Sequence, residues 1–144
     1  MKQYILLTIL GLILINCSKP DDVTPVTSTH VLDGKWQLIK ITYGYPPPNQ
    51  PTFTTNVSNE IYQFSPSNMT FSVTKDGKIT ENGSYKVETK VKNTVEEKSV
   101  IFLTDNTYST YTMLSNNQEL VLYQRTPIGA VLADGNSFHY NKVP

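Results

Sequence analysis

The feature that most constrains the fold of this chain is a repeated alternation of apolar and polar residues. Over residues 85–92, one set of positions alternates strictly with the other: Tyr85, Val87, Thr89 and Val91 against Lys86, Glu88, Lys90 and Lys92. Successive side chains of a β-strand point to opposite faces, so the pattern indicates a strand with one face in a core and one in water. No stretch after Val31 keeps the 3.6-residue helical period over three turns. The domain is therefore predicted to be all-β.

Eight strands are expected in series, and most are joined by short polar turns. Asp76-Gly77 is the clearest turn signal, because both central positions of a type I′ turn require positive φ. The strands are predicted near 35–43, 60–65, 69–75, 78–91, 97–104, 107–114, 119–125 and 137–143, with the fourth interrupted at Asn82-Gly83. Short links imply antiparallel neighbours in up-and-down order, which closes naturally into a small barrel. A two-sheet β-sandwich fits the strand pattern equally well.

The N-terminus has the pattern of an export signal. One lysine precedes an apolar run from Tyr4 to Ile15, which is shorter than the roughly 20 residues that a membrane-spanning helix needs. Cys17 is the only cysteine of the chain, so disulfides are excluded, and it lies where the apolar run stops. These residues resemble a bacterial lipoprotein signal, with Asn16 in place of the usual small residue before the cysteine. The resemblance implies cleavage after residue 16 and lipidation, including a palmitate-type acyl chain, at Cys17.

Residues 17–30 are interpreted as the lipidated cysteine and a flexible tether, because they are polar, contain two prolines and show no periodicity. Residues 31–144 then form the barrel domain. Ser18 resembles the pattern of lipoproteins sent to the outer membrane, and Asp21-Asp22 resembles a short signal for export to the cell surface. The expected location is therefore the cell outer membrane, with the protein held by its lipid.

A family resemblance begins at the first predicted strand. Gly34 and Trp36, within Leu32-Asp33-Gly34-Lys35-Trp36, resemble the Gly-x-Trp signature of lipocalins. The long loop after that strand, the Tyr-rich hairpins and the closing segment 134–142 are similar to the small lipocalin-like lipoprotein domains of Bacteroidetes-type bacteria. The resemblance covers roughly residues 31–143 and favours the barrel over the sandwich. It implies that Trp36 closes the barrel floor against a basic side chain from a late strand.

That basic partner is either Arg125 or Lys142. We favour Arg125, the only arginine, because a guanidinium stacks on an indole and is less strongly hydrated than an ammonium. The alternative for Arg125 is a solvated charge at a strand end.

Two long links stand out from the short turns. Residues 44–56 include Pro46-Pro47-Pro48 and occupy the place where lipocalins carry a flap over the open end of the barrel; this segment is either a packed connection or a contact patch. Residues 126–133 form the second link, and their apolar side chains, Ile128, Val131 and Leu132, are expected to cover a barrel end.

Catalysis is not expected. Only His30 and His139 are present, and His139 is expected to face solvent, so no triad or metal-ligand spacing can be assembled and no cofactor is predicted. The charges balance at 12 basic and 12 acidic residues, which argues against nucleic-acid binding. We expect a monomer whose contact with the membrane is made through its lipid.

Two functions remain. The first is a lipid-anchored protein whose barrel or barrel mouth binds a small apolar or amphipathic ligand, as the lipocalin resemblance implies. The second is a surface interaction module whose loops contact another envelope protein or a glycan. The expected contact residues are five aromatics: Tyr45, Phe53, Phe71, Tyr85 and Tyr123. A small barrel can also be filled by its own side chains, here expected to be Trp36, Leu38, Met69, Phe71, Val73, Tyr85, Val87, Phe102 and Leu122.

Overall fold

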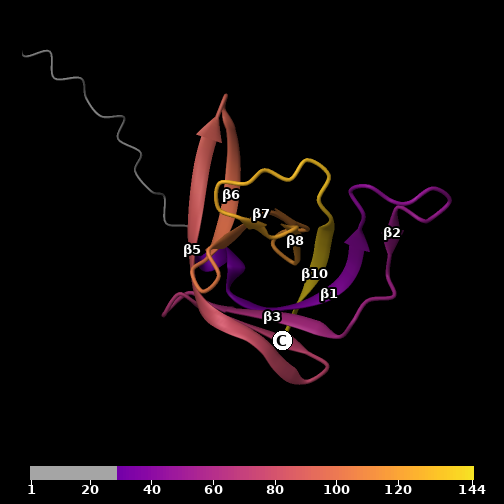
Figure 1. Ribbon diagram of the computed structural model, residues 1–144. Helices are drawn as coiled ribbons and strands as arrows, with labels where there is room; N and C mark the ends of the chain where they lie inside the picture. Colours follow the sequence, from indigo (N-terminus) through magenta and orange to yellow (C-terminus); the bar gives the residue numbers. More distant parts are fainter. Residues whose placement is uncertain (1–28) are drawn as a thin grey trace, which may run out of the picture.

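The computed structural model describes residues 29–144, which form one closed antiparallel β-barrel (Figure 1). Cys17, the apolar run before it and Asp21-Asp22 lie outside the described residues. A 3₁₀ turn, η1 (Thr29–Leu32), precedes the strands, and the described part of the chain contains no α-helix. The strands are β1 (Gly34–Thr42), β2 (Phe53–Thr54), β3 (Glu60–Ser65), β4 (Thr70–Lys75), β5 (Lys78–Lys92), β6 (Val95–Phe102), β7 (Thr107–Leu114), β8 (Glu119–Tyr123), β9 (Thr126–Pro127) and β10 (Ser137–Val143).

Eight of these strands make the barrel wall in the order in which they occur along the chain. The sheet runs β10-β8-β7-β6-β5-β4-β3-β1, and β10 also pairs with β1, which closes the ring. Leu38 lies opposite Tyr140 across this closing seam. The predicted up-and-down barrel is therefore confirmed, and the sandwich alternative is wrong. Closure leaves the wall without the unpaired edges that an open sheet has to protect.

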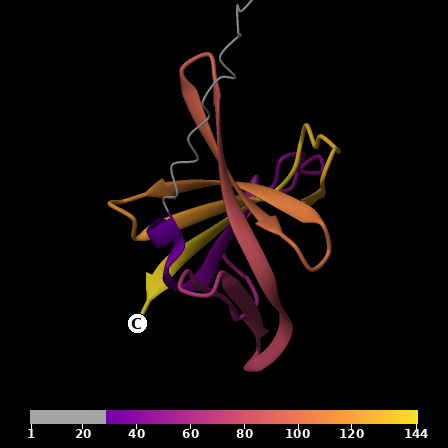
Figure 2. The same cartoon turned by 90° about the vertical axis from the view of Figure 1, so that its left-hand side faces the viewer.

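The predicted strand positions agree closely with the structure, and two differences have local causes. β5 runs unbroken through Asn82-Gly83, so the predicted interruption is wrong: the strand pairs with β4 up to Ser84 and with β6 from Tyr85 onward. The two-residue strands β2 and β9 were not predicted, because such short pairings have no period to read. Figure 2 shows the β5–β6 ribbon rising beyond the rest of the wall.

The Asp76-Gly77 turn between β4 and β5 has the predicted conformation. Both residues have positive φ, 50° for Asp76 and 78° for Gly77, as a type I′ turn requires. This turn sets the start of the β4–β5 pairing, in which Lys75 lies opposite Lys78. On the other side of β4, Lys75 lies opposite Glu60 of β3.

The barrel interior is filled by its own side chains. Aromatic rings pack against one another, with centroids 5.2 Å apart for Phe64 and Tyr85 and 4.8 Å apart for Phe71 and Phe102. Seven of the nine predicted interior residues are buried, and the other two, Met69 and Val87, are partly buried against the same cluster. Aromatic and aliphatic side chains therefore occupy most of the barrel interior.

Candidate functional site

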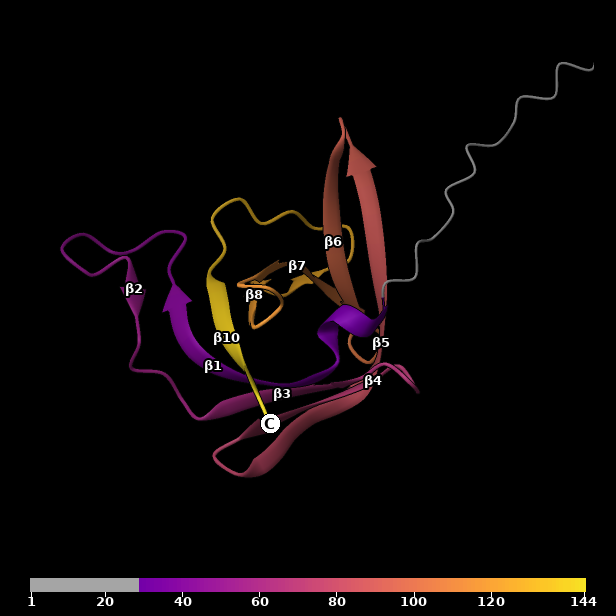
Figure 3. The ribbon, with the colours of Figure 1, turned by 180° about the vertical axis from the view of Figure 1, so that it is seen from behind.

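One end of the barrel is closed around Trp36. The Trp36 side chain is fully buried, and its indole N–H donates a hydrogen bond of 2.8 Å to the carbonyl oxygen of Leu32 in η1. Figure 3, seen from behind, shows η1 lying within the outline of the barrel wall. The role expected for Trp36 as a floor residue agrees with this position.

The basic side chain at this floor is Lys142, so the expectation that Arg125 packs on Trp36 is wrong. The Lys142 ammonium lies 5.4 Å from the centroid of the Trp36 ring. Gly34 makes this approach possible: its φ is +108°, and a Cβ atom there would lie 3.0 Å from Cε of Lys142. Gly34, Trp36 and Lys142 thus form one packed unit at the closed end.

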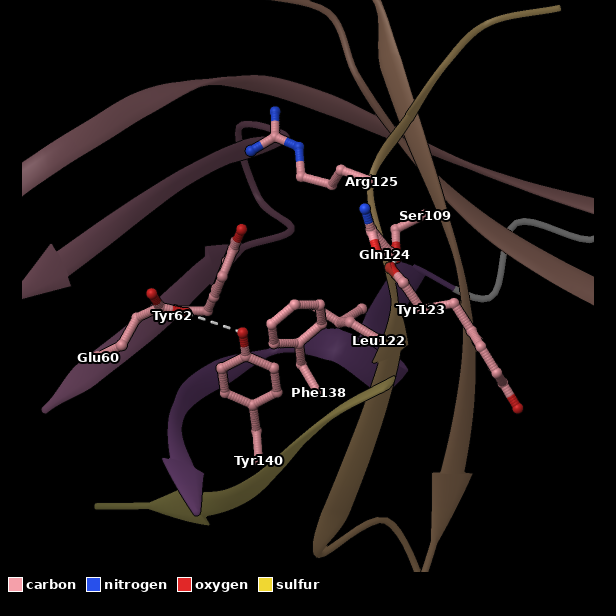
Figure 4. Close-up of a pocket in the computed structure, with 9 residues that line it drawn as sticks. All are labelled: Glu60, Tyr62, Ser109, Leu122, Tyr123, Gln124, Arg125, Phe138 and Tyr140. Carbon is pink, nitrogen blue, oxygen red and sulfur yellow. Dashed lines mark hydrogen bonds between the residues drawn. The ribbon is translucent and has the colours of Figure 1, made fainter. Parts of the chain in front are cut away.

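The opposite end of the barrel, the mouth, contains a cavity of about 290 Å³. It opens where β3 begins and where β8 ends, beside β10 (Figure 4). Its lining combines aromatic, apolar and charged side chains: Glu60, Tyr62, Ser109, Leu122, Tyr123, Gln124, Arg125, Phe138 and Tyr140. Pockets that bind small molecules commonly measure about 300–1,000 Å³, so this cavity is at the small end of that range.

Arg125 holds one side of the mouth together. Its Nη1 donates to both carboxylate oxygens of Glu81, at 2.8 and 2.7 Å, and its Nη2 donates to Asp105 Oδ2 at 2.7 Å. Its Nε donates to the Thr107 hydroxyl at 3.1 Å. The guanidinium therefore joins β5 to the β6–β7 turn and the start of β7, and two acidic partners more than neutralise its charge.

Tyr140 and Glu60 meet across the mouth from strands far apart in sequence. The Tyr140 hydroxyl donates a hydrogen bond of 2.9 Å to Glu60 Oε1, drawn in Figure 4. Burial raises the pKa of Tyr62 to about 12 and that of Tyr140 well above its usual value. Both phenols thus stay protonated at neutral pH and act as neutral hydrogen-bond donors and aromatic walls.

Of the five aromatic residues predicted as contacts, only Tyr123 lines the cavity, and in Figure 4 its side chain points away from the other lining residues. Phe71 and Tyr85 are buried in the core, at 3% and 1% exposure. Tyr45 and Phe53 are exposed, but no residue of the 44–56 loop lines the mouth cavity, so this loop is not a flap over it. The lining residues Glu60, Tyr62, Phe138 and Tyr140 were missed, although inward alternation along β3 places Glu60 and Tyr62 on one face.

Two other expectations are corrected by the structure. Val131 is 91% exposed, and Ile128 and Leu132 are about half exposed, so the 126–133 link does not seal a barrel end. His139 does not face solvent freely: its Nδ1 lies 3.1 Å from Glu119 Oε1 and its Nε2 lies 3.1 Å from the Thr42 hydroxyl. These contacts tie β10 to β8 and to β1 on the outside of the closing seam.

Two features are absent from residues 29–144. No group of three or more His, Cys, Asp and Glu side chains is placed to hold a metal ion within this range. None of its helical segments has the length and hydrophobicity of a membrane span.

No protein-family model, curated protein or solved structure matches this chain. The mouth offers a small cavity with an apolar wall, four aromatic side chains, hydroxyl groups, a carboxylate and a guanidinium.

Proposed function

We propose that this protein is a lipid-anchored envelope protein with a lipocalin-like barrel that binds a small amphipathic molecule at its mouth. The observation that carries the proposal is the 290 Å³ cavity, in which Leu122 and Phe138 supply apolar surface beside the polar groups of Glu60 and Tyr140. Small-molecule sites combine apolar lining with a few convergent polar groups in this way. The role is binding without catalysis.

The filled interior restricts where the ligand lies. Because Phe71, Phe102 and Tyr85 occupy the barrel axis, the ligand sits at the mouth and not deep inside the barrel. It is accordingly a compact molecule with one apolar and one polar end.

The anchoring part of the proposal rests on Cys17 and the apolar run before it, with Ser18 and Asp21-Asp22 favouring the outer membrane and its surface. The barrel geometry is compatible with such an anchor, because the chain enters β1 at the closed end, beside Trp36 and η1. A lipid attached on that side leaves the mouth facing away from the membrane.

Equilibrium dialysis of the full chain, held in nanodiscs of zwitterionic lipid, tests the ligand-binding proposal. The probes are benzylamine, benzyl alcohol and benzoate, with empty nanodiscs as the blank. We expect saturable one-to-one binding of at least one probe, lost in Phe138→Ala because that variant removes a cavity wall. Phe53→Ala is the matched control, since Phe53 is exposed and lies outside the cavity lining.

Unfolding curves must show that Phe138→Ala still folds, because Phe138 also packs against the core. If no probe binds the wild-type chain above the blank, ligand binding at the mouth is wrong. Binding lost in Phe53→Ala and kept in Phe138→Ala would move the site to the 44–56 loop.

A second function is favoured by the exposed apolar side chains of the 126–133 link. Val131 and Leu132 lie beside a surface hollow of about 510 Å³ that also includes Tyr108 and Tyr123. Exposed apolar surface of this kind commonly marks a contact with another protein. Crosslinking in cells, with Val131→Ser/Leu132→Ser as the variant, tests whether this link contacts an envelope protein; an unchanged crosslinking pattern would exclude it.

A further inference from the structure

We infer that the mouth cavity selects ligands carrying a positively charged amine next to an aromatic or apolar group. This inference rests on the proposed function, because it names the ligand class of the same site. It follows from which polar groups at the mouth still have bonding capacity and from the sign of the charge around them.

Arg125 is the only cationic side chain that lines the cavity, and its bonding capacity is largely used by the protein itself. All three of its nitrogens donate hydrogen bonds, Nη1 to Glu81, Nη2 to Asp105 and Nε to Thr107. Its guanidinium also lies over Phe102, at 3.8 Å from the ring centroid. An anionic ligand reaching Arg125 would have to displace one of these partners or lie beside their carboxylates.

Unlike Arg125, Glu60 has bonding capacity that the protein does not use. Its Oε1 accepts the hydrogen bond from Tyr140, and within residues 29–144 no hydrogen bond or ion pair to its Oε2 is found. Lys75 lies opposite Glu60 in the strand register, but it is exposed and makes no ion pair with that carboxylate. Glu60 can therefore accept a further hydrogen bond from a ligand donor.

The net charge near the mouth also favours a cation. Glu60, Glu81 and Asp105 outnumber Arg125 by two charges. Lys75 and Lys78 lie nearby at the β4–β5 turn, but both are exposed and neither forms an ion pair with Glu60. Because the cavity is small and partly enclosed, this charge is screened less than it would be at an open surface.

The aromatic walls supply the second attraction for a cation. Tyr62 and Tyr140 pack edge to face, with centroids 5.5 Å apart, and Phe138 lies beside them in the lining (Figure 4). Ring faces attract ammonium groups, and sites that combine aromatic rings with a carboxylate bind amines and quaternary ammonium groups. A ligand amine would pair with Glu60 while its apolar part contacts Leu122.

The three dialysis probes distinguish this inference from the proposed function. Benzylamine is cationic at pH 7, benzyl alcohol has the same number of non-hydrogen atoms without the charge, and benzoate is anionic. We expect benzylamine to bind the full chain in nanodiscs at least tenfold more tightly than benzyl alcohol, and benzoate to bind most weakly.

The decisive variant is Glu60→Gln, which keeps the shape of the side chain and removes its charge. We expect it to weaken benzylamine binding by at least tenfold and benzyl alcohol binding much less, because the amide oxygen of Gln still accepts a hydrogen bond from a hydroxyl but carries no charge. Glu96→Gln is the matched control, because Glu96 is exposed near the tip of the β5–β6 ribbon, and it should change neither affinity.

Equal binding of benzylamine and benzyl alcohol, or tighter binding of benzoate, would overturn the preference for amines and leave ligand binding at the mouth intact. An unchanged benzylamine affinity in Glu60→Gln would overturn it as well. If none of the three probes binds, the proposed function itself is wrong.

Discussion

The guanidinium of Arg125 lies over the ring of Phe102, with Cζ 3.8 Å from the ring centroid, while its edge bonds to Glu81 and Asp105. An arginine can stack on a ring and still donate in its own plane, which an ammonium cannot do. Arg125 thus joins the aromatic core to the rim of the mouth and connects the first half of β5 to the β6–β7 turn.

Replacing Arg125 with Lys should destabilise the barrel by about 1–3 kcal/mol, because a single ammonium cannot reach Glu81, Asp105 and the Thr107 hydroxyl together, as the three guanidinium nitrogens do. Urea unfolding of the full chain measures this loss. Lys86→Gln is the control: it breaks the exposed Lys86–Glu88 pair and should cost less than about 1 kcal/mol. Equal effects of the two variants would show that Arg125 is an ordinary surface charge.

Stability should fall on acidification partly through Asp105. Burial alone would raise the pKa of this carboxyl, but the hydrogen bonds from Thr107 and the charge of Arg125 outweigh it and hold the pKa below its usual value. The folded state thus binds the proton less readily than the unfolded chain. This contribution is present above about pH 4 and is lost as the pH falls through the lowered folded value.

Urea midpoints measured from pH 6 to pH 2.5 test this linkage in the wild type and in Asp105→Asn. The variant should be less stable at pH 6, and its stability should decline less steeply below pH 4. Parallel curves for the two proteins would contradict the contribution of Asp105.

Removing the hydroxyl group of Tyr85 and that of Tyr140 should change the stability of the protein in opposite directions. Tyr85 is 1% exposed, and its hydroxyl oxygen has no hydrogen-bond partner among the described residues, whereas the Tyr140 hydroxyl donates to Glu60. We expect Tyr85→Phe to stabilise the protein by about 1 kcal/mol and Tyr140→Phe to destabilise it by about 1 kcal/mol. Thermal and urea unfolding measure both; a large loss in Tyr85→Phe would reveal a partner for that hydroxyl.

Cys17→Ala should abolish lipid attachment. The acyl chains of a lipoprotein supply about 0.8 kcal/mol per buried methylene, and the nearly neutral domain offers the membrane no comparable attraction. The variant should persist as an uncleaved precursor or be released if another peptidase cuts it. Labelled palmitate incorporation measures the loss, and equal labelling of variant and wild type would show that Cys17 is not the anchor.

The fold was largely predictable because period-two alternation marks each wall strand independently of its neighbours. Val87 and Lys86 need only their own order in the chain to be assigned to opposite faces. The continuity of β5 past Asn82-Gly83 was not predictable in this way, since it depends on a change of partner from β4 to β6 at Ser84 and Tyr85.

The mouth was harder to predict because its contacts join residues from distant strands. Glu60 and Tyr140 are 80 residues apart and meet only when the ring is closed. The ring partner of Arg125 was difficult to predict for the same reason. Trp36 and Phe102 are both inward aromatics, and the alternation does not distinguish between them, whereas in the structure the guanidinium lies over Phe102 and bonds to Asp105. Sequence alternation assigns a side chain to a face but does not give its height along the barrel.

The seam between β1 and β10 also determines when the chain can finish folding. Lys35 pairs with Val143, so the first and last strands are neighbours in space although almost the whole domain separates them along the chain. Contacts between residues so far apart in the sequence require a large loss of loop-closure entropy, and folds that depend on them fold slowly. Until β10 is available, β1 keeps one unpaired edge, so the ring itself can close only after all of the other wall strands have been made.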